Sequence, residues 1–422
     1  MISTRRQVIC GAAASLIAMP AILVRGEERP AADGELPLRG GEILPTPDFA
    51  QLRRDAQFLA GVRPHRRGGA NLSLEPEIHS PRGVKFLIHN YGHSGAGVTL
   101  SWGCASIARD HVQTALHQLR RTRTRASVAI LGCGVIGLTT AAEVRRKWPK
   151  LPMTIYAKTP VTDTTSYIAG GQFEPSQIWT EYNTPDTKPI LDDYLRRSAQ
   201  RIREIMSSRR WTQYGTVLRK NYTLDDPNPS FDEHTPPDVI PPFRPGRLPF
   251  AKLHPAGREY QTWLINPRIL LPRLAADLAR AGVPIRRREF RDRREVETLA
   301  ETIIVNCTGY GAKTLFDDQT LEARRGHLVV LKNPGKLKYL FSGGCENEVI
   351  AYLFCRQSDI VVGGTVFRRD ERDHFDPSDP RDKAICNRLL DNIEKVFDGH
   401  PEACVGSLRD IARVQVPAEL LR

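Results

Sequence analysis

The sequence has no closely spaced cysteines. Its eight cysteines form no CxxC pair, and no group of His and Cys has the spacing of a metal site. The chain therefore shows no sign of a zinc-binding fold or a thioredoxin-like redox motif, and we expect no metal site.

The basic residues are not interleaved with aromatic ones. Lys and Arg number 61 against 48 Asp and Glu, which gives a formal net charge of +13. The positive charges stand in short runs beside apolar segments, at 120–125 and 286–294. A nucleic-acid-binding protein would set them among aromatics or on a known binding motif. We expect no nucleic-acid partner and interpret the runs as solvated connections, with weak steering of anionic substrates left open.

The apolar segment near the N-terminus is too short for an ordinary bilayer span. It ends at Val24 and is closed by Arg25, and Arg5 and Arg6 precede it. The combination resembles a twin-arginine export signal. We expect residues 1–26 to engage the twin-arginine export machinery, to touch the membrane only during export, and to deliver the protein to the periplasm. A general secretory signal or an uncleaved anchor is the alternative. Because twin-arginine cargo folds before export, we expect the cysteines to stay small, buried and unpaired.

Hydrophobic periodicity predicts a fold of the α/β class. With 422 residues, the chain is long enough for two domains. Strand and helix alternate around residues 128–157, and several strand-like runs follow residue 302. We expect a Rossmann-like nucleotide-binding domain and a second, mainly β (α+β) substrate domain. A short helix over 49–59 and a turn over 61–69 are expected near the start. The Pro-rich segment at 225–250 is either a lid or disordered. The expected strands are 84–89, 127–132, 153–157, 302–309, 327–332, 348–355 and 359–367, and the expected helices are 98–119, 138–148, 190–208, 268–282 and 384–397.

A GxGxxG pattern lies between a predicted strand and a predicted helix. Gly132 allows the tight turn, Gly134 lets the backbone approach a pyrophosphate, and Gly137 lets helix and strand pack closely. The free N–H groups at the helix start would face the phosphates. Lys158 stands at the end of the next strand, where an acid commonly binds the ribose. The group that contacts the adenosine ribose is therefore not identified by the pattern, or it is the Lys158 side chain or the backbone.

Four separated motifs resemble those of the D-amino-acid oxidase family, whose members are FAD flavoproteins. They are GVRPHRRGG at 61–69, IHNYGHSGAGVTLSWGCA at 88–105, DTTSYIAGGQFEPS at 163–176 and IIVNCTGYGA at 303–312. The resemblance covers most of the chain after residue 60. The resemblance implies that the cofactor is FAD. The glycine pattern alone does not distinguish an NAD-binding from an FAD-binding protein.

The order of these motifs departs from the family. There the arginine motif and the YGxxxxG loop close the chain, whereas here they precede the GxGxxG pattern. The simplest interpretation is a circularly permuted order, with HQLRRTRTRAS at 117–127 as the new connection. A degenerate duplication with a lost C-terminus is the alternative. The expected division is an export signal at 1–26, a linker at 27–60, a permuted segment completing the FAD and substrate site at 61–120, the Rossmann core at 126–180, the substrate domain with its Pro-rich loop and return helix at 181–300, an FAD-domain strand at 301–316, and substrate-domain strands with a C-terminal helix at 317–422.

The resemblance also implies roles for single residues. Arg63 would bind the substrate carboxylate, Tyr352 would donate a hydrogen bond from its hydroxyl to the same carboxylate, and Gly95 would lie in the loop beside the reacting atoms. Alternatively, Arg63 is a surface residue in a turn, Tyr352 a core tyrosine, and the loop an ordinary helix start. The expected FAD contacts are Gly132, Gly134, Val135, Ile136, Gly137, Lys158, Thr164, Thr165, Ser166, Gly170, Gly171, Gln172, Thr308, Gly309, Ser94, Gly95, Gly97, Val98 and Thr99.

The implied reaction is oxidative deamination of a D-amino acid by hydride transfer to flavin N5, followed by hydrolysis to a 2-oxo acid and ammonia. Dioxygen would reoxidise the flavin and give hydrogen peroxide. A flavin dehydrogenase with another electron acceptor and a non-catalytic flavin-binding protein remain alternatives. Glu348, expected at the pocket mouth, would favour cationic or neutral substrate side chains.

Overall fold

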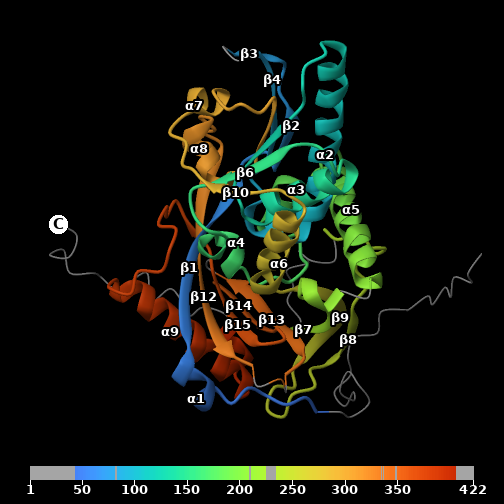
Figure 1. The fold of residues 1–422 in the computed structure, drawn as a ribbon. Coiled ribbons are helices and arrows are strands. Elements are labelled where there is room, and N and C mark those ends of the chain that lie inside the picture. The colour runs from blue at the N-terminus through green and yellow to red at the C-terminus, as the bar shows by residue number, and fades with distance from the viewer. Residues whose placement is uncertain are drawn as a thin grey trace, which may run out of the picture.

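Two β-sheets organise the chain, one above the other in Figure 1. The computed structural model describes residues 43–80, 83–208, 211–224, 234–333, 335, 337–346 and 349–404. The expected export signal, residues 27–42 of the expected linker, residues 225–233 of the Pro-rich segment, Glu348 and the chain from residue 405 lie outside these ranges.

The upper sheet has a parallel core with an antiparallel strand at one side. Its order is β10-β6-β5-β11-β4-β2, and β3 pairs with β4. The strand that precedes the GxGxxG pattern is β5, at the centre, and β4 enters the same sheet on the far side of β11. The strands are β2 (Asn71–Leu74), β3 (Ile78–Ser80), β4 (Gly83–Tyr91), β5 (Val128–Leu131), β6 (Met153–Ala157), β10 (Ile285–Arg287) and β11 (Ile303–Asn306).

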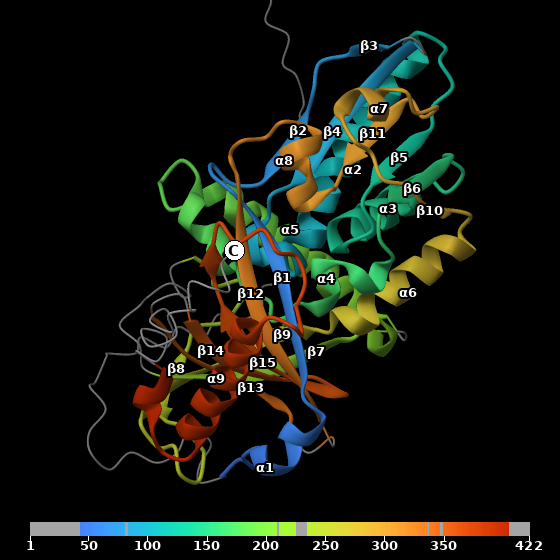
Figure 2. The same cartoon turned by 90° about the vertical axis from the view of Figure 1, so that its left-hand side faces the viewer.

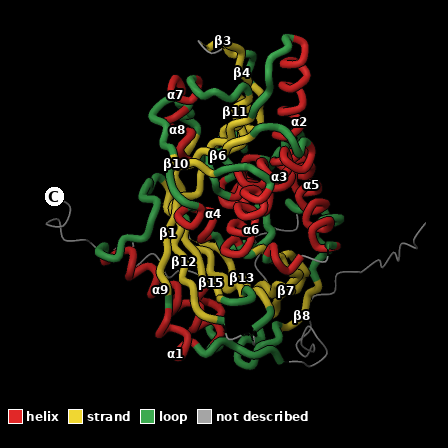
Figure 3. Tube along the Cα trace, viewed as in Figure 1, coloured by secondary structure: helices red, strands yellow, loops and turns green. Residues whose placement is uncertain are grey.

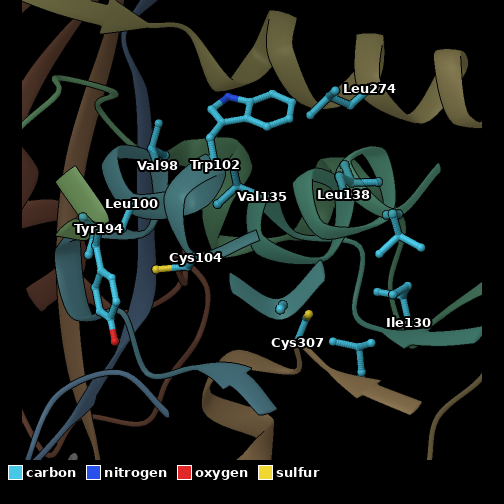
Figure 4. Packing of buried hydrophobic residues seen from close by; sticks show 14 of the residues in the cluster. Val98, Leu100, Trp102, Cys104, Ile130, Val135, Leu138, Tyr194, Leu274 and Cys307 are labelled. Atoms are coloured by element: carbon cyan, nitrogen blue, oxygen red, sulfur yellow. The ribbon is translucent and has the colours of Figure 1, made fainter. Parts of the chain in front are cut away.

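Both faces of this sheet are buried, as its continuous apolar strands require. Ile130 belongs to one apolar cluster and its neighbour Leu131 to another, because successive side chains point to opposite faces. Figure 4 shows the first cluster, where Trp102 extends toward Leu274. Its helices are α2 (Gly97–Arg121), α3 (Val135–Lys147), α5 (Lys188–Ser207) and α6 (Pro267–Arg280), and the other face carries α7 (Arg293–Glu297) and α8 (Ala312–Leu315).

The lower sheet is mostly antiparallel, with one parallel pair between β13 and β7; Figure 3 shows its strands in yellow. Its order is β1-β12-β15-β14-β13-β7-β9-β8, with β16 against β12. One face packs on α9 (Pro380–Phe397) and α1 (Phe49–Leu52), and the other turns toward the upper sheet; Figure 2 shows α1 and α9 at the same end. The strands are β1 (Gln57–Arg66), β7 (Thr216–Leu224), β8 (Arg244–Arg247), β9 (Ala256–Ile265), β12 (Leu321–Lys332), β13 (Tyr339–Glu346), β14 (Val349–Cys355), β15 (Asp359–Thr365) and β16 (Phe367–Arg368).

The expected strands and helices are present within the described residues, but the segment before residue 67 differs. The helix expected over 49–59 ends at Leu52, and a single 3₁₀ turn follows it. The last residues of the expected linker and most of the expected turn form the ten-residue strand β1, which leaves the turn only residues 67–69. Pro64 disfavours a strand at this point of the sequence, because proline has no N–H group to donate to a neighbouring strand. It is tolerated because β1 is an edge strand, where proline's missing N–H costs no ladder hydrogen bond.

One further boundary differs. β10, expected within the substrate domain, pairs in parallel with β6 and extends the nucleotide-binding sheet instead.

The cysteines behave as expected over the described ranges. Cys104, Cys133, Cys307, Cys355 and Cys386 are unpaired and buried, and burial raises the pKa of the Cys307 and Cys386 thiols to about 12. Among the same residues, none of the helices combines the length and the hydrophobicity needed to cross a bilayer, and no three metal-ligating side chains come together.

Candidate active site

A cavity of about 1140 Å³ lies between the two sheets. Its wall contains residues of both glycine loops, of the loop after β6, and of the inner face of the lower sheet. Among the described residues, all those expected at the cofactor and substrate site line it except Gly137. Segments far apart in the sequence, including 61–99 and 163–174, thus meet around one space.

Gly137 acts from behind the cavity wall. A side chain there would overlap the carbonyl oxygen of Gly132, so helix α3 can approach β5 only with glycine at this position. Gly132 itself has φ +105°, a conformation that L side chains rarely adopt. The turn therefore delivers the N-terminus of α3 to the cavity, where its N–H groups can face an anion.

The loop after β6 covers that helix start. Ser166 Oγ accepts a hydrogen bond of 3.0 Å from the Val135 N–H, and Thr164 and Thr165 line the cavity beside it. Lys158, directly after β6, is exposed and lies 3.7 Å from Oε1 of Glu289. Glu289 follows the adjacent parallel strand β10 and also lines the cavity. An acid is thus present beside Lys158, and no local sequence pattern predicts it, because the pairing of β10 with β6 is a tertiary contact.

The second glycine loop leads from β4 into α2. Ser94 has φ +52°, and its Oγ lies 3.1 Å from Nδ1 of the buried His65. A side chain at Gly95 would meet Ser176 Oγ at 2.7 Å and Arg63 Cδ at 3.5 Å, so this loop lies against the arginine. Gly97 and Val98 open α2 at the cavity wall.

Thr99 lines the cavity, and its hydroxyl is hydrogen-bonded to a neighbouring segment of the wall. Its hydroxyl donates to the Glu174 carbonyl at 2.8 Å and accepts from the Glu174 N–H at 3.0 Å. The hydroxyl is therefore used to hold the segment 170–174 against α2. It is not a spare donor toward the flavin.

That segment contributes two glycines and an amide to the cavity. A side chain at Gly170 would meet the ring of Phe354 at 3.1 Å, and one at Gly171 would overlap the Ile265 carbonyl. Gln172 donates from Nε2 to the Tyr260 hydroxyl at 2.8 Å, while its Oε1 is buried without a partner. Across the cavity, Thr308 and Gly309 lie at the turn after β11.

Arg63 projects from β1 into the cavity and lies over Gly326 of β12, where any side chain would overlap the guanidinium. Its Nη1 donates to the Thr365 carbonyl at 2.8 Å, and it also bonds to the Tyr352 hydroxyl. Among the described residues no carboxylate lies within ion-pair distance of it. Burial lowers its pKa from the usual 12.5. A half-buried guanidinium that faces a cavity without a counter-ion is suited to a ligand carboxylate.

Tyr352 on β14 faces the same space. Its ring stacks on Phe354 with centroids 4.2 Å apart, and burial raises its pKa to about 12 despite the nearby charge of Arg63. The hydroxyl therefore keeps its proton at neutral pH and can donate a hydrogen bond. Arg63 is thus no surface residue, and Tyr352 belongs to the wall of the cavity as well as to the sheet.

Glu174 is a cavity residue to which the sequence analysis gave no role. Burial raises the pKa of its carboxyl from 4.5 to about 7, and its charge acts on Tyr352. It can therefore gain or lose a proton near neutral pH. The shift in its pKa is caused by burial, so it could not be predicted from the sequence.

The cavity fits a dinucleotide. A helix N-terminus behind a glycine turn suits a pyrophosphate, and the buried atoms His93 Nε2 and Gln172 Oε1 have no protein partner. The volume exceeds the range of about 300–1,000 Å³ that holds drug-sized ligands.

Comparison with known proteins agrees with this chemistry. The model of the family described as "FAD dependent oxidoreductase" (DAO) matches residues 127–416. The D-amino-acid oxidase of Streptomyces coelicolor is 27% identical over 244 residues, which cover 56% of this chain and 69% of that protein. Human D-aspartate oxidase is 25% identical over 245 residues, 57% of this chain and 68% of that protein.

Solved structures give more distant matches. Glycine oxidase from Geobacillus kaustophilus has 18% identity and a TM-score of 0.42, over 58% of this chain and 72% of that one. Iminodiacetate oxidase from Chelativorans sp. BNC1 has 14% identity and a TM-score of 0.45, over 65% and 79%.

The raised pKa of Glu174 predicts a pH-dependent stability. A carboxyl whose folded pKa is about 7 costs stability as pH rises from its ordinary 4.5 through 7, because the folded state then holds its proton more tightly than the unfolded state. We expect Glu174→Gln to match the parent at pH 5 and to be more stable at pH 8, by up to about 3 kcal/mol.

Urea unfolding of the FAD-free protein at the two pH values measures this difference. Glu289→Gln is the control, since its side chain is 70% exposed and should change stability little at either pH. An equal gain for Glu174→Gln at pH 5 and pH 8 would contradict the burial of an ionisable carboxyl.

Proposed function

The chain belongs to the family of FAD-dependent oxidoreductases, and we propose that it oxidises D-amino acids to 2-oxo acids with release of ammonia and hydrogen peroxide. FAD is its cofactor and supplies the acceptor for the two electrons removed from the substrate. The observation that carries the proposal is the half-buried Arg63 guanidinium, which has no carboxylate partner in the described chain and lies beside the Tyr352 hydroxyl and the Gly95 loop.

The residues of the wall divide the work. Arg63 and Tyr352 bind the substrate carboxylate, and this two-point contact orients the rest of the molecule. The Thr365 carbonyl and Gly326 fix the guanidinium in place. The start of α3 would hold the FAD pyrophosphate, while the loops containing Gly95 and Gly170 would enclose the ring.

The preference for the D configuration is supported by relatives. The D-amino-acid oxidases of Streptomyces coelicolor and Dictyostelium discoideum and human D-aspartate oxidase all match over more than half of this chain. Structural neighbours include an L-amino acid deaminase from Proteus vulgaris, so the configuration has to be measured.

The test is peroxide release in air by the FAD-loaded protein with matched D- and L-amino acids. We expect a D-selective signal. We also expect Arg63→Ala to raise KM by about 100-fold, the loss of roughly two charge-assisted hydrogen bonds, while FAD stays bound. Arg63→Lys keeps the charge but not the planar fork, so it should fall in between.

Each alternative outcome has a meaning. Bleaching of the flavin by substrate without peroxide would indicate a dehydrogenase with another electron acceptor. A bound flavin that no amino acid reduces would indicate a non-catalytic flavin protein. Unchanged kinetics in Arg63→Ala would remove Arg63 from the site.

We further propose that the order of the chain is circularly permuted. The family match begins at residue 127, yet the preceding segment supplies β1 and β4 to the two sheets. Only residues 122–127 separate α2 from β5. At the other junction, the ring of Phe49, just before β1, lies 6.2 Å from that of Phe397 at the end of α9. A short link could therefore join the end of α9 to the segment before β1, and a cut between α2 and β5 would then give the motif order of the family.

A rearranged chain tests this order. It would begin at residue 122, run to residue 422, and continue through a short Gly/Ser linker into residues 43–121. We expect it to fold and to bind FAD within about tenfold of the parent affinity, since the contacts are the same. A chain that ends before the linker should not bind FAD. Failure of the rearranged chain to bind FAD would count against permutation.

Finally, we propose export to the periplasm by the twin-arginine route, on the basis of Arg5, Arg6 and the apolar segment after them. A reporter protein fused behind residues 1–42 should reach the periplasm of a bacterial host. Replacing both arginines by lysine should abolish this export. Export that survives the double replacement would indicate a general secretory signal.

A further inference from the structure

Three arginines stand in one row across the lower sheet. In the ladder of β1 and β12, Arg63 pairs with Arg324, and Arg324 in turn pairs with Arg368 of β16. Residues directly opposite each other in a sheet point to the same face. All three line the cavity, with Arg63 and Arg324 in its wall and the exposed Arg368 beside them.

No acid of the described chain forms an ion pair with this row, although the charges of Glu322 and Glu181 act on Arg324 from a greater distance. None of the three guanidinium groups lies within 4.0 Å of a carboxylate oxygen over the described ranges. Arg324 is 8% exposed, its Nη1 donates to Gln177 Oε1 at 3.4 Å, and its Nε is buried without a partner. Burial and the charge of Arg368 both lower the pKa of Arg324.

The two acids whose charges act on Arg324 are held by other donors. Glu181 lies 3.2 Å from Nε2 of His65 and accepts from the Gly68 N–H at 2.9 Å. Glu322 pairs with Arg67 at 3.4 Å. The pKa of His65 is lowered to about 4 by burial and then by the charge of Arg324, so this histidine is neutral and adds no further charge.

A row of like charges that includes the buried Arg324 and the half-buried Arg63 is unfavourable without an anion. The FAD pyrophosphate would not be this anion, because the site proposed for it is the N-terminus of α3, which packs on the upper sheet. Arg63 takes one carboxylate under the proposed function. Because adjacent strands lie about 5 Å apart, a second anionic group at Arg324 would be only a short side chain away from the first.

We propose that Arg324, supported by Arg368, binds a second carboxylate of the substrate, so that the preferred substrates are amino acids with an acidic side chain. The inference rests on the proposed function. It favours the opposite substrate charge from the one expected from Glu348.

The first experiment measures binding without turnover. Glutarate and butyrate differ in the second carboxylate, and each is titrated into the FAD-loaded protein by calorimetry. We expect glutarate to bind at least tenfold more tightly. Arg324→Gln should abolish this ratio, Arg324→Lys should keep part of it, and Arg368→Gln should reduce it less because that side chain is exposed. Arg291→Gln is the matched control: this arginine also lines the cavity, but it is 89% exposed and lies near Glu295.

The second experiment measures turnover with isosteric pairs. D-glutamate should exceed D-glutamine, and D-aspartate should exceed D-asparagine, by at least tenfold in kcat/KM. Arg324→Gln should raise KM for the acid of each pair by at least tenfold and leave the amide nearly unchanged.

The results separate this inference from the proposed function. A glutarate preference that depends on Arg324, without oxidation of any amino acid, supports the subsite and rejects the oxidase. Equal binding of glutarate and butyrate by the parent protein, an unchanged ratio in Arg324→Gln, or a best substrate with a cationic side chain overturns the subsite. The first and the third of these outcomes are measured on the parent protein alone, so the inference stays testable if Arg324→Gln does not fold.

Discussion

The pairing of β1 with β12 is the constraint on which the site depends. The ladder runs without a break from Gln57 opposite Val330 to Arg66 opposite Leu321. It sets Arg63 opposite Arg324 and brings the guanidinium over Gly326. Because side chains alternate across a strand, a slip by one residue would turn Arg63 away from the cavity. Gly326 is needed for the same reason, since a side chain there would occupy the place of the guanidinium.

The opposite face of β12 supports this arrangement through a buried charge network. Arg325 donates from Nη1 to Oδ1 of Asp382 at 2.6 Å, and His327 lies 3.1 Å from the same carboxylate. The backbone N–H of His327 donates to Thr365 Oγ1 at 2.9 Å, and the Thr365 carbonyl accepts from Arg63. Removing one member of such a buried pair leaves an uncompensated charge, which costs several kcal/mol. The position of the carboxylate-binding arginine is thus tied to helix α9 on the far side of the sheet.

Local signals predicted much of the frame. Gly132, Gly134 and Gly137 stand between a strand and a helix; Gly132 makes the tight turn and Gly137 the close helix–strand approach that their spacing implies. The buried strands of the upper sheet were visible as apolar runs. The strand β1 was missed because Pro64 indicates a turn in any local window. Only the edge position, which depends on pairing with a strand more than 250 residues away, makes proline acceptable there.

The sequence by itself determined the family of chemistry, because a dinucleotide turn and the flavin-type motifs are short patterns whose conformation is local. It did not determine which charged groups meet around the substrate. Glu289 beside Lys158, Glu174 with its raised pKa, and Arg324 beside Arg63 arise from strand pairing and burial. These long-range contacts set the electrostatic environment, and their effect on a charge depends on distance and desolvation, which no local pattern encodes.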